Sequence, residues 1–115
     1  MAHILIAEDQ LAQRLLIKSI LEKEGHQTYL AEDGEEALRV LLEHPQITTL
    51  ITDIDMPRLN GVDLLAELNH RQDLHKIVIS SHHEDHFKVK TQRFGSLSFL
   101  EKPIRPQMLR GMFQV

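Results

Sequence analysis

The sequence predicts one α/β domain in which a parallel five-stranded sheet is covered by helices on both faces. Short β-type runs alternate with helical patterns along the whole chain, and this alternation is typical of parallel sheets with helices on both sides. The length of 115 residues suits one domain with its own hydrophobic core. An apolar share of 42% and a charged share of 26% are ordinary for a folded globular chain.

The first half of the chain contains three predicted strands and two predicted helices. The strands lie at residues 3–7, 27–31 and 49–52. The first helix is predicted by the i/i+4 spacing of Leu11, Leu15, Leu16 and Ile20. Gly25 is a natural end for it. Asp33, with Glu36 three residues later, forms a capping box that opens the second helix. The apolar residues of that helix are Ala37, Leu38, Leu41 and Leu42.

The second half continues the same alternation. A loop at residues 54–60 leads into a third helix, whose apolar residues are Val62, Leu65 and Leu68. Strands follow at residues 76–79 and 98–100. Between them, Ser81 and Gly95 mark the ends of a fourth helix. Pro106 suits the first turn of a last helix, which turns inward Leu109, Met112 and Phe113.

Composition excludes several classes of function. The absence of cysteine rules out disulfides, thiolate zinc sites and cysteine nucleophiles. The longest apolar run covers only residues 4–7, and the start of the chain does not resemble a secretory signal. The net charge of −4, without a basic block, argues against nucleic-acid binding. We therefore expect a cytoplasmic protein that contacts neither a membrane nor nucleic acid.

Reactive side chains directly follow four of the five predicted strands. Glu8 and Asp9 follow the first strand, Asp53 the third, Ser80 the fourth and Lys102 the fifth. Ligands of open parallel sheets bind beyond the carboxyl ends of the strands. These side chains are therefore expected to form one cluster.

The expected cluster has the chemistry of phosphoryl transfer. Two carboxylates about 4 Å apart repel by roughly 4 kcal/mol at an effective dielectric constant of 20. A hard divalent cation relieves this repulsion, and the all-oxygen ligand set favours Mg²⁺ or Mn²⁺. Lys102 and Ser80 add a cation and a hydroxyl donor that suit a phosphoryl group. A carboxylate beside a metal and a lysine can itself attack phosphorus and form an aspartyl phosphate.

Taken together, these residues resemble the bacterial response-regulator receiver family, in particular its chemotaxis regulators, over essentially the whole chain. The motifs that carry the resemblance are Glu8-Asp9, residues 53–61, Ser80-Ser81, Lys102-Pro103 and residues 31–38. The resemblance implies a flavodoxin-like (βα)5 fold of three layers, with strand order 2-1-3-4-5 across residues 1–115. Because the last helix is short and no output domain follows, we expect a receiver cut from a longer protein.

The resemblance also implies how the phosphoryl group is received. Asp53 would accept it from a sensor histidine kinase or a phosphotransfer protein. Mg²⁺ would be held directly by Asp9 and Asp53, through a water by Glu8, and by the backbone carbonyl of Asp55. The chain would then be a signalling switch that catalyses only its own phosphorylation and dephosphorylation.

Further residues would read the phosphorylated state. Ser80 would donate a hydrogen bond to the phosphoryl group, and Lys102, in a cis peptide bond with the proline after it, would pair with that group. Phe99 matches an aromatic switch position at which tyrosine is frequent, and Ser80 stands where threonine is frequent. Asp55 and His82 are candidates for tuning the lifetime of the phosphate. The surface formed by the fourth helix, fifth strand and last helix would contact an output domain, a partner protein or a second copy.

Three alternatives remain at this stage. A haloacid-dehalogenase-type phosphohydrolase would also use Asp53, Asp55, Ser80 and Lys102, but that family places its metal-binding acidic pair after the lysine. A degenerate receiver would bind partners without being phosphorylated. A histidine zinc site would involve His82, His83 and His86, although a solvated helix start explains these residues better.

Overall fold

Five parallel strands form the middle layer of the structure, a computed structural model that describes residues 1–54, 56–80 and 97–113. The strands are β1 (His3–Ala7), β2 (Gln27–Ala31), β3 (Thr49–Asp53), β4 (His75–Ser80) and β5 (Leu97–Glu101). Their order is β2-β1-β3-β4-β5, and every neighbouring pair is parallel. This confirms the predicted fold class and strand order, and each predicted strand end lies within one residue of the observed one.

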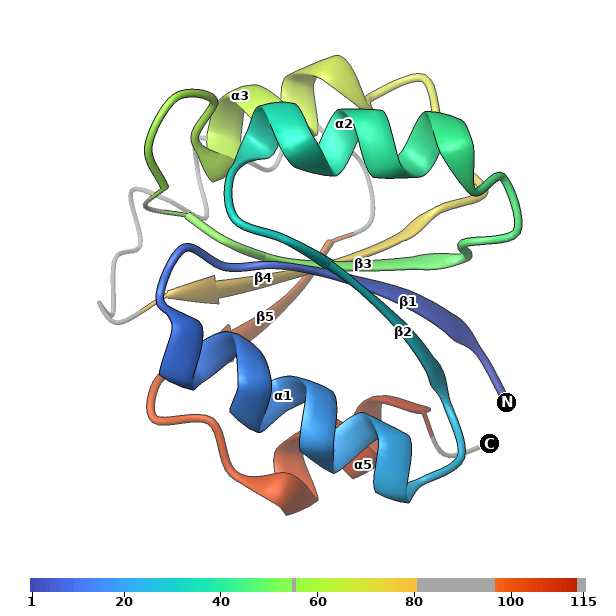
Figure 1. Ribbon diagram of the computed structural model, residues 1–115, viewed down its shortest axis with the longest axis vertical. Helices are drawn as coiled ribbons and strands as arrows, with labels where there is room; N and C mark the ends of the chain where they lie inside the picture. Colours follow the sequence, from blue (N-terminus) through green and yellow to red (C-terminus); the bar gives the residue numbers. More distant parts are fainter. Residues whose placement is uncertain (55, 81–96, 114–115) are drawn as a thin grey trace.

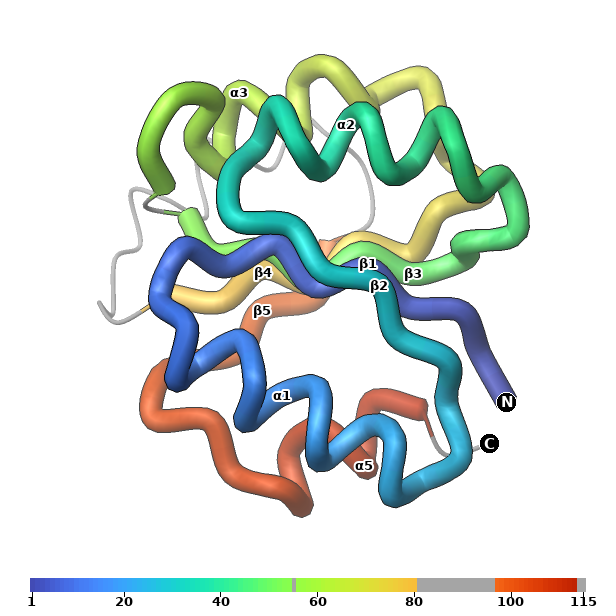
Figure 2. The backbone as a smooth tube through the Cα atoms, viewed as in Figure 1, coloured from blue at the N-terminus to red at the C-terminus, as the bar shows by residue number. Residues whose placement is uncertain are grey.

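Helices cover both faces of this sheet, as Figure 1 shows. One face carries α2 (Gly34–Glu43) and α3 (Gly61–Glu67), and the other carries α1 (Leu11–Lys23) and α5 (Pro106–Phe113). The backbone trace in Figure 2 shows the same three layers. The helix predicted between Ser81 and Gly95 lies outside the described residues. In the part of the chain that is described, no helix is long and apolar enough to cross a membrane.

Alternation along the strands produces a separate core on each face. Leu5 and Leu50 are fully buried in the cluster under α2 and α3. Ile4 and Ile51, their neighbours in sequence, are fully buried in the cluster under α1 and α5. Because successive side chains of a strand point to opposite faces, a sheet covered on both sides requires these continuous apolar runs.

The buried face of α1 is not formed by the apolar residues that predicted this helix. Leu11, Leu15 and Leu16 are 59%, 47% and 43% exposed, so three of the four residues that gave the helical period lie outside the core. The buried residues are Arg14, Ile17, Ile20 and Leu21. At about 100° per residue these four share one side of the helix, whereas the three leucines fall on either side of it. Leu42, one of the apolar residues that predicted α2, is 85% exposed.

The helix ends follow the predicted local signals. Asp33 caps α2 by accepting a hydrogen bond from the Glu36 backbone N–H at 2.8 Å. Asn60 caps α3 in the same way, accepting from the Asp63 backbone N–H at 3.0 Å. Gly25 follows α1 with a φ of 87°, a left-handed conformation that glycine adopts without steric cost. The two N-caps fix where the loops after β2 and β3, at the carboxyl edge of the sheet, end.

Candidate functional site

The predicted site residues meet at the carboxyl edge of the sheet. Asp53 ends β3 and Ser80 ends β4, while Glu8 and Asp9 follow β1 and Lys102 follows β5. Oxygen atoms of Glu8, Asp9 and Asp53 all lie within 4.8 Å of one another. The predicted convergence of the three carboxylates is confirmed.

Lys102 joins this cluster from the far end of the chain. Its Nζ donates a hydrogen bond to Asp53 Oδ2 at 2.6 Å and another to Glu8 Oε1 at 3.3 Å. Its backbone N–H donates to the Ser80 carbonyl oxygen at 2.9 Å, which fixes the end of β5 to the end of β4. The peptide bond between Lys102 and Pro103 is cis, as predicted. The lysine therefore contacts two of the three carboxylates directly.

The cluster contains more acidic than basic side chains. Burial, together with the adjacent carboxylate of Asp53, raises the pKa of Glu8 to about 7, although Lys102 opposes the rise. Burial by itself would lower the pKa of Lys102, but its bonds to Asp53 and Glu8 and their charges outweigh burial and raise it. The cluster thus holds three carboxylates and one ammonium group, which contacts two of them. Additional positive charge would stabilise the ionised form of the cluster.

The donor set fits a hard divalent cation. Oxygen Oε2 of Glu8 is buried and has no hydrogen-bond partner among the described residues, and an unsatisfied buried oxygen is costly. Asp9 is exposed, so the cluster has a side open to solvent. Carboxylate oxygens without nitrogen or sulfur donors match Mg²⁺ or Mn²⁺.

Ser80 ends β4, the strand next to β3, and Phe99 lies on β5, one strand further out. The Ile54 backbone N–H donates to the Ile79 carbonyl oxygen at 3.2 Å, so the residue after Asp53 is tied to the residue before Ser80. Phe99 is half-buried and packs against the cluster of Ile54, Leu65 and Val78. The predicted switch position therefore packs against the core cluster that contains Ile54, the residue after Asp53, and pairs in register with Val78 of β4. Asp55, His82, His83 and His86, which the sequence analysis named, lie outside the described residues.

Sequence reasoning missed two residues that support the site loops, Arg14 and Arg58. Arg14 is buried, and its Nη1 donates to the Glu8 carbonyl oxygen at 2.7 Å. Arg58 Nε donates to Asp33 Oδ2 at 2.9 Å. The signal for Arg14 was its spacing: it lies three residues before Ile17, so both fall on the same face of α1, and that face is buried. No local sequence pattern predicts the ion pair between Arg58 and Asp33.

Gly61 lies at the other end of the β3–α3 loop from Asp53. Its backbone N–H donates to the Ile54 carbonyl oxygen at 2.9 Å, which closes the loop. A Cβ atom at this position would collide with the carbonyl oxygen of Asp53. Only glycine therefore allows α3 to begin so close to Asp53.

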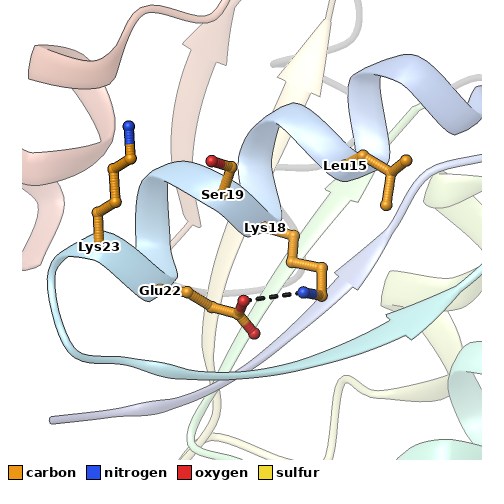
Figure 3. Close-up of a pocket in the computed structure, with 5 residues that line it drawn as sticks. All are labelled: Leu15, Lys18, Ser19, Glu22 and Lys23. Carbon is orange, nitrogen blue, oxygen red and sulfur yellow. Dashed lines mark hydrogen bonds and ion pairs between the residues drawn. The ribbon is translucent and has the colours of Figure 1, made fainter.

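A separate groove lies on the surface of α1 and contains none of the predicted site residues. It is lined by Leu15, Lys18, Ser19, Glu22 and Lys23, which Figure 3 shows along a single helix. Lys18 and Glu22 form an ion pair across it at 2.8 Å. Ion pairs one helical turn apart are common on solvated helix surfaces, so the groove does not compete with the carboxylate cluster as a site of chemistry.

Comparison with known proteins agrees with this geometry. A family model described as the response regulator receiver domain matches residues 4–114. The aerobic respiration control protein ArcA of Escherichia coli K12 is 34% identical over 107 residues, which cover 93% of this chain and 44% of that protein. The response regulator GtcR of Aneurinibacillus migulanus is 35% identical over 103 residues, which cover 90% of this chain and 42% of that protein. The chain thus spans less than half the length of these relatives.

Solved structures give the same result for the fold. The chemotaxis protein CheY4 of Vibrio cholerae superposes with a TM-score of 0.91 at 22% identity, covering 99% of this chain and 97% of that one. A response regulator receiver domain protein from Clostridium thermocellum has a TM-score of 0.86 at 30% identity, covering 95% and 88%. These similarities do not favour the phosphohydrolase alternative.

Proposed function

The chain belongs to the family of response regulator receiver domains, the phosphorelay modules of two-component signalling, and from this membership we propose that Asp53 is its phosphoacceptor. The observation that carries the proposal is the contact of 2.6 Å between Asp53 Oδ2 and Lys102 Nζ inside the three-carboxylate cluster. In this arrangement a carboxylate lies beside a cation and at the edge of a candidate metal site. That is the environment in which a carboxylate acts as a nucleophile toward phosphorus.

The proposed step exchanges one bond to phosphorus for another. An oxygen of the Asp53 carboxylate attacks the phosphorus of a phosphohistidine on a partner protein. The new P–O bond forms as the P–N bond breaks, and the histidine nitrogen keeps the electron pair. Lys102 stays beside the acceptor and offsets the negative charge of the arriving group. No net oxidation or reduction takes place.

Asp9 and Asp53 would hold a divalent cation directly, and Glu8 would support it through a water. When bound, Mg²⁺ neutralises negative charge on the transferred group and the carboxylates. The backbone carbonyl of Asp55, which lies outside the described residues, stays a predicted ligand. The orphaned Glu8 oxygen and the all-oxygen donor set support this assignment.

Phosphorylation would act as a switch because it places a dianion between strands that carry responsive side chains. Ser80 would move toward the phosphoryl group, and the packing of Phe99 against the cluster of Ile54, Leu65 and Val78 would transmit the change to the surface of β5. The surface around β5 and α5 would then bind an output domain, a partner protein or a second copy. Asp55 and His82 stay candidates for tuning phosphate lifetime. We assign residues 1–115 to one receiver domain that acts in the cytoplasm.

The decisive experiment measures the intact mass of the protein after incubation with a small acyl-phosphate donor, with and without Mg²⁺. We expect one phosphoryl adduct that requires Mg²⁺ and is absent from Asp53→Ala. Asp53→Asn is the matched control, since it keeps the size of the side chain but removes the nucleophile. A folded chain that binds Mg²⁺ but forms no adduct would refute the proposal and point to a degenerate receiver. Continuous release of phosphate from a small phosphate ester would instead revive the phosphohydrolase alternative.

A further inference from the structure

The short turn between β2 and α2, residues 31–34, contacts two loops of the site: the loop that carries Glu8 and Asp9 and the loop that follows Asp53. One loop follows β1 and contains Glu8 and Asp9, and the other follows β3 and begins after Asp53. The turn contributes no predicted ligand of its own. Its contacts nevertheless link the two halves of the cluster.

The contacts to the first loop fix both sides of the Glu8 backbone. The Glu8 N–H donates to the Ala31 carbonyl oxygen at 3.0 Å, and the Glu8 carbonyl oxygen accepts from Arg14 Nη1 at 2.7 Å. Arg14 Nη2 also lies 3.7 Å from Glu32 Oε1. The side chain of Arg14 is 9% exposed. Its hydrogen bonds therefore form where the local dielectric constant is low and charge-assisted bonds are strong. Glu8 is thereby held to the turn directly and through Arg14.

The contacts to the second loop involve the other half of the same turn. The two carboxylate oxygens of Asp33 have different partners. Oδ1 caps α2, whereas Oδ2 accepts a hydrogen bond from Arg58 Nε at 2.9 Å. The Gly34 backbone N–H donates to the Leu59 carbonyl oxygen at 3.0 Å, and a Cβ on Gly34 would collide with that oxygen. Arg58 has a φ of 62°, a left-handed conformation that is unfavourable for a residue with a side chain. The ion pair and the close backbone contact hold the loop in that conformation.

We propose that residues 31–34 are a brace that sets the separation between the loop carrying Glu8 and Asp9 and the loop that follows Asp53, and thereby the affinity of the site for a divalent cation. Without a cation the carboxylates of Glu8, Asp9 and Asp53 repel one another, so a flexible site would open. The brace opposes this opening by holding one loop through Arg14 and the other through Arg58. Both arginines are positioning residues, since neither is a predicted ligand. The inference rests on the proposed function, because it takes the cluster to be the cation site of that function.

The arginines give a test in which positioning and simple charge predict opposite results. Removing a positive charge near an acidic site should by itself strengthen cation binding. If the arginines position the loops, their removal should weaken binding instead. Support from residues behind metal ligands is typically worth roughly tenfold in metal affinity, whereas a partly exposed ion pair of about 1 kcal/mol corresponds to about fivefold.

The experiment titrates the full chain with MgCl₂ alone in a calorimeter and records the thermal midpoint of every variant. We expect Arg14→Met to weaken Mg²⁺ binding roughly tenfold, with partial recovery in Arg14→Lys, which retains a donor. Arg58→Gly should weaken binding about fivefold with an unchanged or higher midpoint, because glycine accepts the left-handed backbone. Glu43→Gln, in the exposed pair with Arg39 at the other end of α2, should match the parent chain.

The outcomes separate the two proposals. Mg²⁺ affinities in Arg14→Met and Arg58→Gly that equal or exceed that of the parent chain would overturn the brace while leaving the proposed function intact. Equal weakening in Glu43→Gln would also overturn it, since the effect would then not be specific to the site loops. A folded parent chain that binds no Mg²⁺ would overturn the metal site of the proposed function together with the brace.

Discussion

Replacing Glu8 with glutamine should make the metal-free chain more stable at pH 8. In the folded chain the pKa of Glu8 is raised from 4.5 to about 7. Below pH 4.5 the carboxyl is protonated in both the folded and the unfolded chain, so its burial carries no ionisation penalty. Above pH 7 it is ionised in both states, and the folded state bears the full penalty. The stability of the parent chain should therefore fall as the pH rises from 4.5 to 7.

The size of the effect follows from the difference between these two pKa values. At about 1.4 kcal/mol per pH unit, the penalty amounts to roughly 3 kcal/mol. Glu8 is only 2% exposed, so solvent does little to screen it. Glutamine has nearly the same size, keeps an oxygen that can accept from Lys102, and carries no charge. Glu8→Gln should recover most of the lost stability at pH 8 and little at pH 4.5.

The assay is urea unfolding between pH 4.5 and pH 8 in the presence of a chelator. The informative quantity is the difference in unfolding free energy between Glu8→Gln and the parent chain, because titrating groups that do not interact with Glu8 cancel in it. This difference should grow with pH through the stated window, while Glu43→Gln, on the exposed surface of α2, should show no such growth. Mg²⁺ at a hundred times its Kd adds about 2.7 kcal/mol to a binding chain, and Glu8→Gln should gain less than the parent.

Two results would refute this reasoning. A difference that stays constant with pH would mean that Glu8 is not destabilised by ionisation in the folded chain. A Glu8→Gln variant that is less stable than the parent at pH 8 without Mg²⁺ would mean that the ionised carboxylate stabilises the cluster through Lys102 more than burial opposes it.

Three further predictions follow from the site and the core. Lys102→Met should slow phosphorylation by a small acyl-phosphate donor by a factor on the order of 100, measured as the rate of adduct formation, and a rate equal to the parent's would exclude a role for the ammonium group. Gly61→Ala should lower the unfolding free energy by about 2 kcal/mol, because its Cβ collides with the Asp53 carbonyl oxygen; urea unfolding checks this, and a neutral variant would show that the loop can shift. Ile17→Ala should cost roughly 3 kcal/mol by urea unfolding, whereas Leu15→Ser should stay within about 0.5 kcal/mol of the parent, and the reverse order would contradict the observed buried face of α1.

Local signals in the sequence determined much of this fold. Alternating β-type and helical patterns gave the parallel sheet with helices on both faces, and the caps at Asp33 and Gly25 lie where local chemistry placed them. Capping depends on hydrogen bonds and φ values within a few residues, so a short stretch of sequence contains the information. The resemblance to a known family gave the order of the strands.

Periodicity was a poorer guide to which side of a helix is buried. The leucines at positions 11, 15 and 16 predicted a helix correctly. In the structure, however, Ile17 and Leu21 are buried in the core and those leucines are exposed. A helix can turn about its own axis until its best-packing side meets the sheet. The result depends on the shape of the whole interface, including the bond from Arg14 to Glu8, and not on hydrophobicity alone.

The sequence by itself determined which side chains stand at strand ends, and therefore that Glu8, Asp9, Asp53 and Lys102 share one edge. Only the tertiary structure decided that Lys102 contacts Glu8, 94 residues away, and that the turn after β2 contacts both the loop carrying Glu8 and the loop that follows Asp53. Burial patterns and caps are encoded locally, because they depend on neighbours in the chain. Distances between loops depend on strand register and helix packing, which arise only when elements far apart in the sequence come together.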